Sequence, residues 1–183
     1  MTKIRVLAVM SVMLVALFAT GIVMAGGMKF GTHMTGDQEV PARDTRAQGQ
    51  ANFKLSDDGE TMSYKVIVAN IHNVVAAHIH IAPAGENGPV VVWLVGANAP
   101  EPGPFPVGGG RTQGGVGEGT FTADNFSGPL AGQPMSALVD AIIEGNAYVN
   151  VHTNDGIDPD NTGPGDFPGG EIRGQIELRG KAR

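Results

Sequence analysis

The sequence predicts an all-β domain, an antiparallel Greek-key sandwich or flattened barrel with one short helix. Two observations lead to this fold class. The 28 glycines and 12 prolines punctuate the 183 residues at short intervals, and most of the segments between them alternate apolar with polar residues. Alternation with a period of two is typical of strands, and frequent turn residues favour hairpin connections over long helices.

The first 25 residues have the pattern of an export signal. Lys3 and Arg5 precede an apolar stretch over residues 6–23, and the small residue Ala25 follows it. The stretch is also near the length that spans a bilayer, so a retained anchor is the alternative. We expect cleavage after Ala25, which would make the protein secreted, periplasmic or part of the cell envelope, without membrane contact once the signal is removed.

The remaining 158 residues are enough for one domain with an ordinary core. We expect a flexible leader over 26–34, one domain over 35–179 and a tail over 180–183. Without the two basic residues of the signal, ten basic residues oppose 18 acidic ones, a formal charge of −8. This charge argues against nucleic acid or an anionic membrane as a partner, because both require basic patches. The absence of cysteine excludes disulfides, thiolate metal ligands and a cysteine nucleophile.

The elements follow from the alternation and from the turn residues between the alternating segments. Strands are expected at residues 34–39, 47–55, 62–69, 76–81, 89–95, 117–123, 147–152 and 171–178. The turn that ends at Gly59 joins the second and third strands as a hairpin. The unbroken apolar run at 89–95 suits a strand that is covered on both faces. Residues 134–144 form the helix, since Pro134 suits its first turn and Gly145 stops it.

Three histidines in two of these strands are the main functional signal. His78 and His80 lie two residues apart, so they share a strand face opposite Ala77 and the neighbouring isoleucines. His152 shares a face with Asn150 in the later strand. The small and aliphatic residues mark the core side, so all three imidazoles are expected on the outer face. If they meet there, they form a three-nitrogen metal site.

Other polar residues are weaker candidates for this metal site. His72 has the strand parity of His78 and is a further candidate ligand, although a position in the preceding turn is the simpler interpretation. Asn150, Glu171 and Arg173 are candidates to orient a ligand histidine without touching the metal. For Glu171 and Arg173 we favour the alternative of an ion pair that closes the sheet edge near residues 36–41. The histidines themselves could also be polar residues that bond only to the backbone.

Five motifs resemble the CHRD domain, a module named after chordin and common in exported bacterial proteins. In chain order they are GDQEVP (36–41), AAHIH (76–80), NGPVV (87–91), GNAYVNVHT (145–153) and PGGEIRGQ (168–175). The resemblance covers residues 35–178 and implies an immunoglobulin-like or superoxide-dismutase-like β-sandwich. The histidine pair before a glycine-containing turn, with His152 on a late strand, is also similar to the copper ligands of Cu/Zn superoxide dismutase. The zinc-ligand cluster, the bridging histidine and the disulfide of that enzyme are absent, so this similarity implies a single-metal site.

Three functional hypotheses follow. We favour an exported, non-catalytic protein that binds one metal ion through His78, His80 and His152. The ion is copper on the strength of the resemblance, with zinc as the alternative, and other envelope or extracellular proteins are possible partners. The second hypothesis is a metal-free interaction or adhesion module that uses the loops at residues 96–115 and 154–169. The third, which we favour least, is a redox enzyme with one copper ion.

Overall fold

The computed structural model describes residues 27–100 and 108–180. These residues form nine strands, three short 3-10 turns and one α-helix. The strands are β1 (Lys29–Thr35), β2 (Gln48–Leu55), β3 (Met62–His72), β4 (Val74–Ile81), β5 (Val90–Val95), β6 (Arg111–Phe121), β7 (Ala147–Thr153), β8 (Ile172–Gln175) and β9 (Glu177–Leu178). The turns are η1 (Gly36–Gln38), η2 (Ala123–Asn125) and η3 (Gly128–Leu130), and the helix is α1 (Met135–Ile143). The predicted all-β class with one short helix is confirmed.

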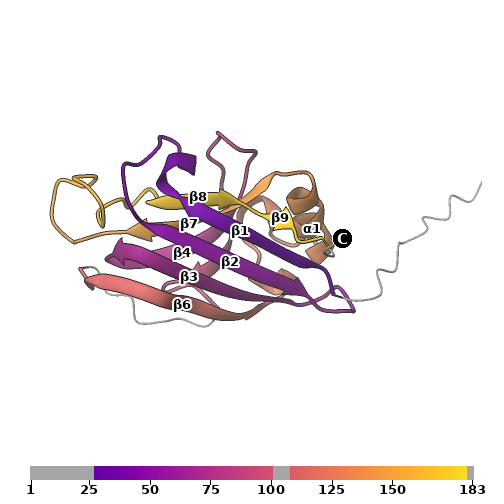
Figure 1. The fold of residues 1–183 in the computed structure, drawn as a ribbon. Helices are drawn as coiled ribbons and strands as arrows, with labels where there is room; N and C mark the ends of the chain where they lie inside the picture. The colour runs from indigo at the N-terminus through magenta and orange to yellow at the C-terminus, as the bar shows by residue number, and fades with distance from the viewer. Residues whose placement is uncertain (1–26, 101–107, 181–183) are drawn as a thin grey trace, which may run out of the picture.

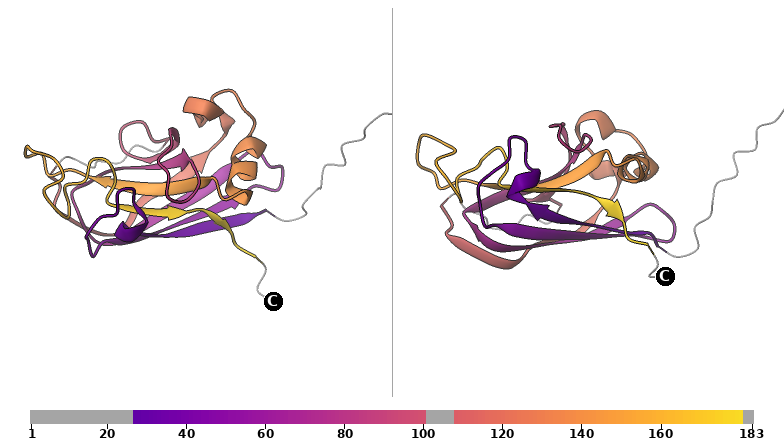
Figure 2. Two further views of the ribbon diagram at one scale, coloured as in Figure 1. Left: turned by 90° about the horizontal axis from the view of Figure 1, so that it is seen from above. Right: turned by 45° about the horizontal axis from the view of Figure 1, so that its top comes forward.

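The strands form one antiparallel sheet that folds over into two layers. Its order is β5-β4-β7-β8-β1-β2-β3-β6, with β9 paired to β1. A single register pair, Thr35 with Arg173, joins β1 to β8 and so links the layer β5-β4-β7-β8 to the layer β1-β2-β3-β6. The two ends of the order approach each other, since a Cβ on Gly117 of β6 would lie 2.6 Å from the Val95 side chain of β5. The result is a nearly closed, flattened barrel (Figures 1 and 2).

The core lies between the two layers and explains the strand alternation. In β2 every second residue is buried, beginning with Gly49 and ending with Leu55. The β2–β3 register places Phe53 opposite Tyr64 and Ala51 opposite Val66, so both strands turn the same face inward. The turn between them contains Gly59 at a φ of +77°, a backbone conformation that favours glycine. The predicted hairpin is therefore present, with β3 extending three residues beyond its expected end.

The structure corrects three expectations. Residues 29–34 are not a flexible leader: they belong to β1, whose Phe30 and Met34 are buried in the core. The expected loop at 96–115 is shorter, because β6 already begins at Arg111. The predicted burial of the run at 90–95 is confirmed, and this run forms β5 at one end of the sheet order. The last strand is divided into β8 and β9, and Leu178 of β9 is 48% exposed rather than turned to the core.

One helix completes the described part of the fold. Helix α1 begins after Pro134 and lies against β7 and β9 at one end of the barrel, with Leu138 and Ile142 buried (Figure 2). Gly145 follows at a φ of +77° and ends it. The expected signal over residues 1–25 lies outside the described residues. Among the residues that are described, no helix has the length and apolar character needed to cross a membrane.

Candidate metal centre

The pairing of β4 with β7 brings the three histidines onto one patch of the sheet. His78 lies opposite Asn150 and Ala76 lies opposite His152 in the antiparallel register. The alternate residues Ala77 and Ile79 are fully buried in the core between the layers. The histidines therefore project from the outer face of the β5-β4-β7-β8 layer, as the alternation predicts.

The imidazole rings lie close enough to share one ion. One nitrogen from each of His78, His80 and His152 can be chosen so that all three lie within 4.8 Å of one another. His78 Nδ1 and His152 Nε2 are 2.9 Å apart, and the two ring centroids are separated by 4.6 Å. The His80 ring centroid lies 5.6 Å from that of His78. Two histidines from one strand and a third from a strand far along the chain thus face a common point.

Backbone carbonyls fix the tautomers of two of the three rings. His80 Nδ1–H donates to the Gly88 carbonyl at 2.8 Å, and His152 Nδ1–H donates to the Pro168 carbonyl at 2.7 Å. A carbonyl oxygen can only accept, so the proton of each neutral ring is on Nδ1 and the lone pair is on Nε2. This is the arrangement by which proteins usually orient metal-binding imidazoles.

Two of the three rings are buried and the third is half-buried, although all of them lie outside the core. His78 and His80 are 7% and 8% exposed, and His152 is half-buried. The Nε2 atoms of His78 and His80 are inaccessible to solvent and have no hydrogen-bond partner among the described residues. An unpaired buried polar atom costs about 1–3 kcal/mol, so two of them on adjacent rings call for a functional reason.

Burial keeps the imidazoles neutral. It lowers the pKa of His78 to about 2, and the neighbouring His152 and His80 add to the effect because two charged rings would repel. Burial also lowers the pKa of His152 to about 4, against the opposing hydrogen bond to Pro168. The pKa of His80 is lowered by burial as well. All three rings therefore offer lone pairs at neutral pH, as metal coordination requires.

Aromatic side chains wall the site on two sides. The Trp93 ring meets His78 edge-on with 4.1 Å between the ring centroids. Tyr148 stacks on His80 at 4.8 Å, with 10° between the ring planes. The Arg173 guanidinium lies 3.4 Å from the centre of the Tyr148 ring, so β8, β7 and β4 contribute successive layers of one stack.

Loops cover the site and are tied to Arg173. Its Nη2 donates to the Pro83 carbonyl at 3.1 Å and to Gln175 Oε1 at 3.2 Å. The Tyr148 hydroxyl accepts from the Gly88 amide at 3.2 Å, which fixes the same loop whose carbonyl binds His80. Arg173 is only 1% exposed and therefore acts as a structural link between the sheet and its covering loop.

The remaining predicted site residues have different positions. Asn150 is buried among the histidines, and its side-chain amide lies 2.9 Å from His152 Nε2. Glu171 contacts neither Arg173 nor a histidine: its carboxylate accepts from Thr45 at 2.6 Å, from Thr153 at 2.7 Å and from the Gly165 amide at 2.9 Å. The expected ion pair with Arg173 is therefore wrong, because Glu171 precedes β8 and anchors the covering loop instead.

The other histidines lie away from this cluster. His72 is the last residue of β3 rather than part of a turn, and it is exposed opposite Arg111. It does not belong to the group of converging ligand atoms. His33 is an exposed residue of β1 that faces Gln50. Both are useful as controls for experiments on the buried histidines.

Sequence reasoning missed Glu39, which the fold brings beside the site. It follows η1, is 6% exposed and faces Gly170 of the loop that covers His152. Burial raises its pKa to about 7, against the opposing effect of Arg173 and Arg43. Residues 36–41 belong to the family motifs, but no periodicity in the sequence indicates that this segment folds against the histidine face.

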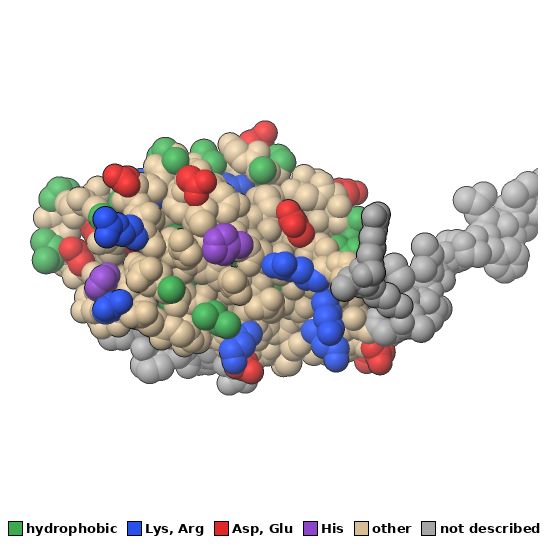
Figure 3. Space-filling view, in the orientation of Figure 1, with side chains coloured by type: hydrophobic (Ala, Val, Ile, Leu, Met, Phe, Trp, Pro, Cys, Tyr) green, Lys and Arg blue, Asp and Glu red, His purple; other side chains and the backbone are tan. Residues whose placement is uncertain are grey.

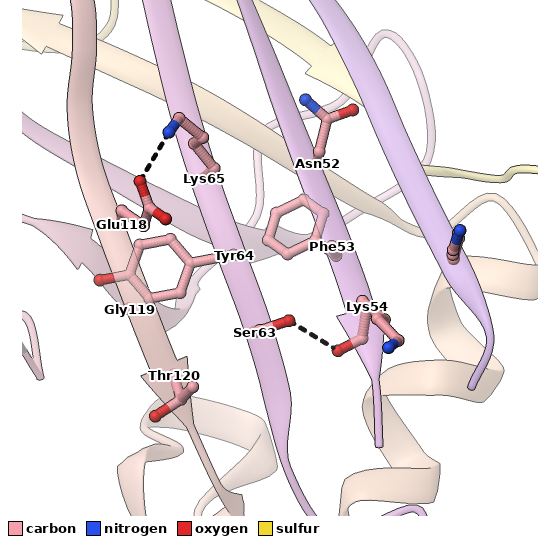
Figure 4. Close-up of a pocket in the computed structure, with 10 residues that line it drawn as sticks. Asn52, Phe53, Lys54, Ser63, Tyr64, Lys65, Glu118, Gly119 and Thr120 are labelled. Carbon is pink, nitrogen blue, oxygen red and sulfur yellow. Dashed lines mark hydrogen bonds and ion pairs between the residues drawn. The ribbon is translucent and has the colours of Figure 1, made fainter. Parts of the chain in front are cut away.

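A shallow groove lies on the opposite layer of the barrel. It has a volume of about 510 Å³ and is lined by residues of β1, β2, β3 and β6 (Figure 4), on the face of the molecule that Figure 3 presents. Figure 4 shows Lys65 paired with Glu118 at 2.6 Å and the Ser63 hydroxyl donating to the Lys54 carbonyl. Its polar side chains are solvent-exposed or half-exposed, so nothing in it matches the buried, unpaired nitrogens of the histidine site.

The comparison with known families agrees with the sequence motifs. No match to a curated protein or to a solved structure was found. A family model described as "CHRD domain" matches residues 30–176, which is most of the chain and includes every strand that contributes to the histidine site. The chain therefore belongs to the CHRD domain family.

Proposed function

We propose that this domain is an exported, non-catalytic protein that binds one transition-metal ion through His78, His80 and His152, with copper favoured. The observation that supports it most is the convergence of three neutral imidazole nitrogens within 4.8 Å, outside the core and beneath covering loops. Hydrogen bonds to backbone carbonyls leave the lone pairs of His80 and His152 on Nε2.

The donor set favours particular metals. Three imidazoles and no thiolate suit Cu(II), Cu(I) or Zn(II) rather than the oxygen-seeking Mg²⁺ and Ca²⁺. Copper binds nitrogen donors more tightly than zinc in the usual order of divalent affinities. We assign the site to retention or delivery of the ion outside the cell.

The segments that carry the family resemblance support the same location. Residues 76–80 and 145–153 provide the ligands, 87–91 provides the carbonyl that binds His80, and 168–175 provides both the carbonyl that binds His152 and Arg173. The fifth segment, 36–41, provides Glu39. Motifs from five separate parts of the chain thus surround one small site.

Metal titration of the protein purified without a histidine tag tests the proposal. The sequence has one tryptophan, Trp93, and its ring lies 4.1 Å from His78, so Cu(II) bound there should quench the protein's fluorescence. We expect quenching to saturate at one Cu(II) per chain and to be lost in His78→Ala and His152→Ala.

The exposed histidines provide matched controls. His33→Ala and His72→Ala should titrate like the wild type, because neither belongs to the cluster. Wild-type protein that binds no stoichiometric Cu(II) or Zn(II), with unchanged thermal stability in excess metal, would refute the proposal. That result would favour a metal-free interaction module.

A further inference from the structure

Glu39 is a buried carboxyl group with a backbone hydrogen bond from Val40 but no ion pair among the described residues. Its side chain is 6% exposed, and Oε1 makes no hydrogen bond to any described residue. The only ion pair found in the described part of the chain is Lys65–Glu118, so neither Arg43 nor Arg173 neutralises Glu39 by direct contact. A carboxylate left in this condition would be costly, which indicates a group that is neutral for part of the time.

The side chain of Glu39 faces the histidine site across one glycine. A Cβ built on Gly170 would lie 2.5 Å from Glu39 Oε1 and 2.9 Å from Asn150 Nδ2, so both side chains approach the same point. The Asn150 amide in turn lies 2.9 Å from His152 Nε2. Glu39 is therefore separated from a proposed metal ligand by a single amide side chain.

The charge of a bound metal ion is a second reason to consider Glu39. Three neutral histidines would leave both positive charges of a divalent ion uncompensated in a buried place, which is unfavourable. Glu171 is poorly suited to change its charge when a metal ion binds, because its two oxygens already accept three hydrogen bonds. Asp166 is held ionised by hydrogen bonds from Thr162, which lower its pKa, so its charge does not change on binding.

We propose that Glu39 is the compensating carboxyl of the histidine site: when a divalent metal ion binds, Glu39 releases its proton to solvent and the resulting carboxylate offsets one unit of the metal's charge. This inference rests on the proposed function. Apart from the bonds between the ion and the three imidazole nitrogens, only the O–H bond of Glu39 changes, and the oxidation state of the metal stays the same. Asn150 lies where it can turn its amide N–H toward the new carboxylate.

The surroundings of Glu39 permit this proton exchange. The charged groups near it are Arg173 of β8, Arg43 beyond η1, and Asp37 of η1. Burial outweighs the two arginines and raises the pKa of Glu39 to about 7, so the metal-free protein contains a mixture of both forms at neutral pH. Glu39, Asp37 and Arg173 line a cavity of about 200 Å³ through which the proton can reach solvent.

Calorimetric titration with Zn²⁺ alone measures the proton directly. The protein is titrated in buffers that differ in ionisation enthalpy, and the slope of the observed enthalpy gives the protons released per zinc. With a pKa of about 7, wild-type protein should release about 0.9 proton at pH 6, about 0.5 at pH 7 and about 0.1 at pH 8. A zinc-bound water would give the opposite trend, because its own proton is lost as the pH rises through about 7.

Two variants assign the proton to Glu39. Glu39→Gln should still bind one zinc, less tightly, and release less than about 0.1 proton at pH 6. Asp37→Asn removes a charge from an exposed residue of the same cavity and should behave like the wild type. Zinc binding with no proton release at pH 6, or with release that Glu39→Gln leaves unchanged, would overturn this inference and leave the proposed function intact. Failure of the wild type to bind zinc or copper would overturn both.

Discussion

The buried carboxyl of Glu39 gives the sharpest stability prediction for the metal-free protein. Its pKa rises from 4.5 to about 7 on folding because burial disfavours the charged form. A folded-state pKa above the unfolded value means that the contribution to stability is greatest at low pH and is lost as the pH rises through 7. Between pH 5 and pH 8 this loss amounts to about 2.5 kcal/mol. Glu39→Gln removes the titration but keeps the shape of the side chain.

The assay is thermal unfolding of wild type and Glu39→Gln in a chelating buffer at several pH values. We expect similar midpoints at pH 5 and a variant that is more stable than the wild type at pH 8, by roughly 5–10 °C for a domain of this size. Asp37→Asn should show no such divergence, since Asp37 is exposed. A difference between Glu39→Gln and wild type that is the same at both pH values would refute the reasoning.

Three further predictions concern the site and its cover. Because the pKa values of His78 and His152 are lowered to about 2 and 4, bound copper should survive dialysis at pH 5, as metal analysis can check. Gly170→Ala should cost about 2–3 kcal/mol in urea unfolding, since its Cβ would lie 2.5 Å from Glu39 Oε1 at a φ of +122°. Arg173→Leu should cost about 2–4 kcal/mol in the same assay and weaken copper binding, because it removes the hydrogen bonds to the Pro83 carbonyl and to the Gln175 side chain.

The two stability predictions have matched controls. Gly132 also has a positive φ, but a Cβ there would meet nothing within 4 Å, so Gly132→Ala should cost only about 1 kcal/mol. Arg46 is exposed, and Arg46→Leu should change stability by less than about 0.5 kcal/mol. If Gly170→Ala cost no more stability than Gly132→Ala, or Arg173→Leu no more than Arg46→Leu, the packing of the loops over the histidine site would be contradicted. Copper loss with a midpoint between pH 6 and 7 would contradict the lowered histidine pKa values.

Local sequence patterns were sufficient to predict which side chains lie on the histidine face. Alternation in residues 76–81 and 147–152 fixes which side chains share a face, and aliphatic neighbours such as Ile79 and Val151 identify the core side. The convergence of His78 and His152 additionally required β4 to pair with β7, which the family motifs made plausible and the register shows.

Other parts of the fold depend on contacts between distant segments. Residues 29–34 contain too short an apolar pattern to predict a strand, yet β1 is stabilised by pairing with β2 and β9 on either side. The glycines at 114 and 115 interrupt the pattern in the first half of β6, which the sequence did not predict and which forms because β3 provides its partner. The buried state of Glu39 and Arg173 likewise arises only when the covering loops fold onto the sheet.

Nitrogen hyperfine spectroscopy of Cu(II)-loaded protein tests the central claim most directly, because it counts the imidazoles that bind the ion. We predict one Cu(II) per chain with couplings from three histidine rings, reduced to two rings or abolished in His80→Ala and unchanged in His33→Ala. A Cu(II) signal that shows no imidazole coupling, or one that survives unaltered in His80→Ala, would contradict a metal site formed by His78, His80 and His152.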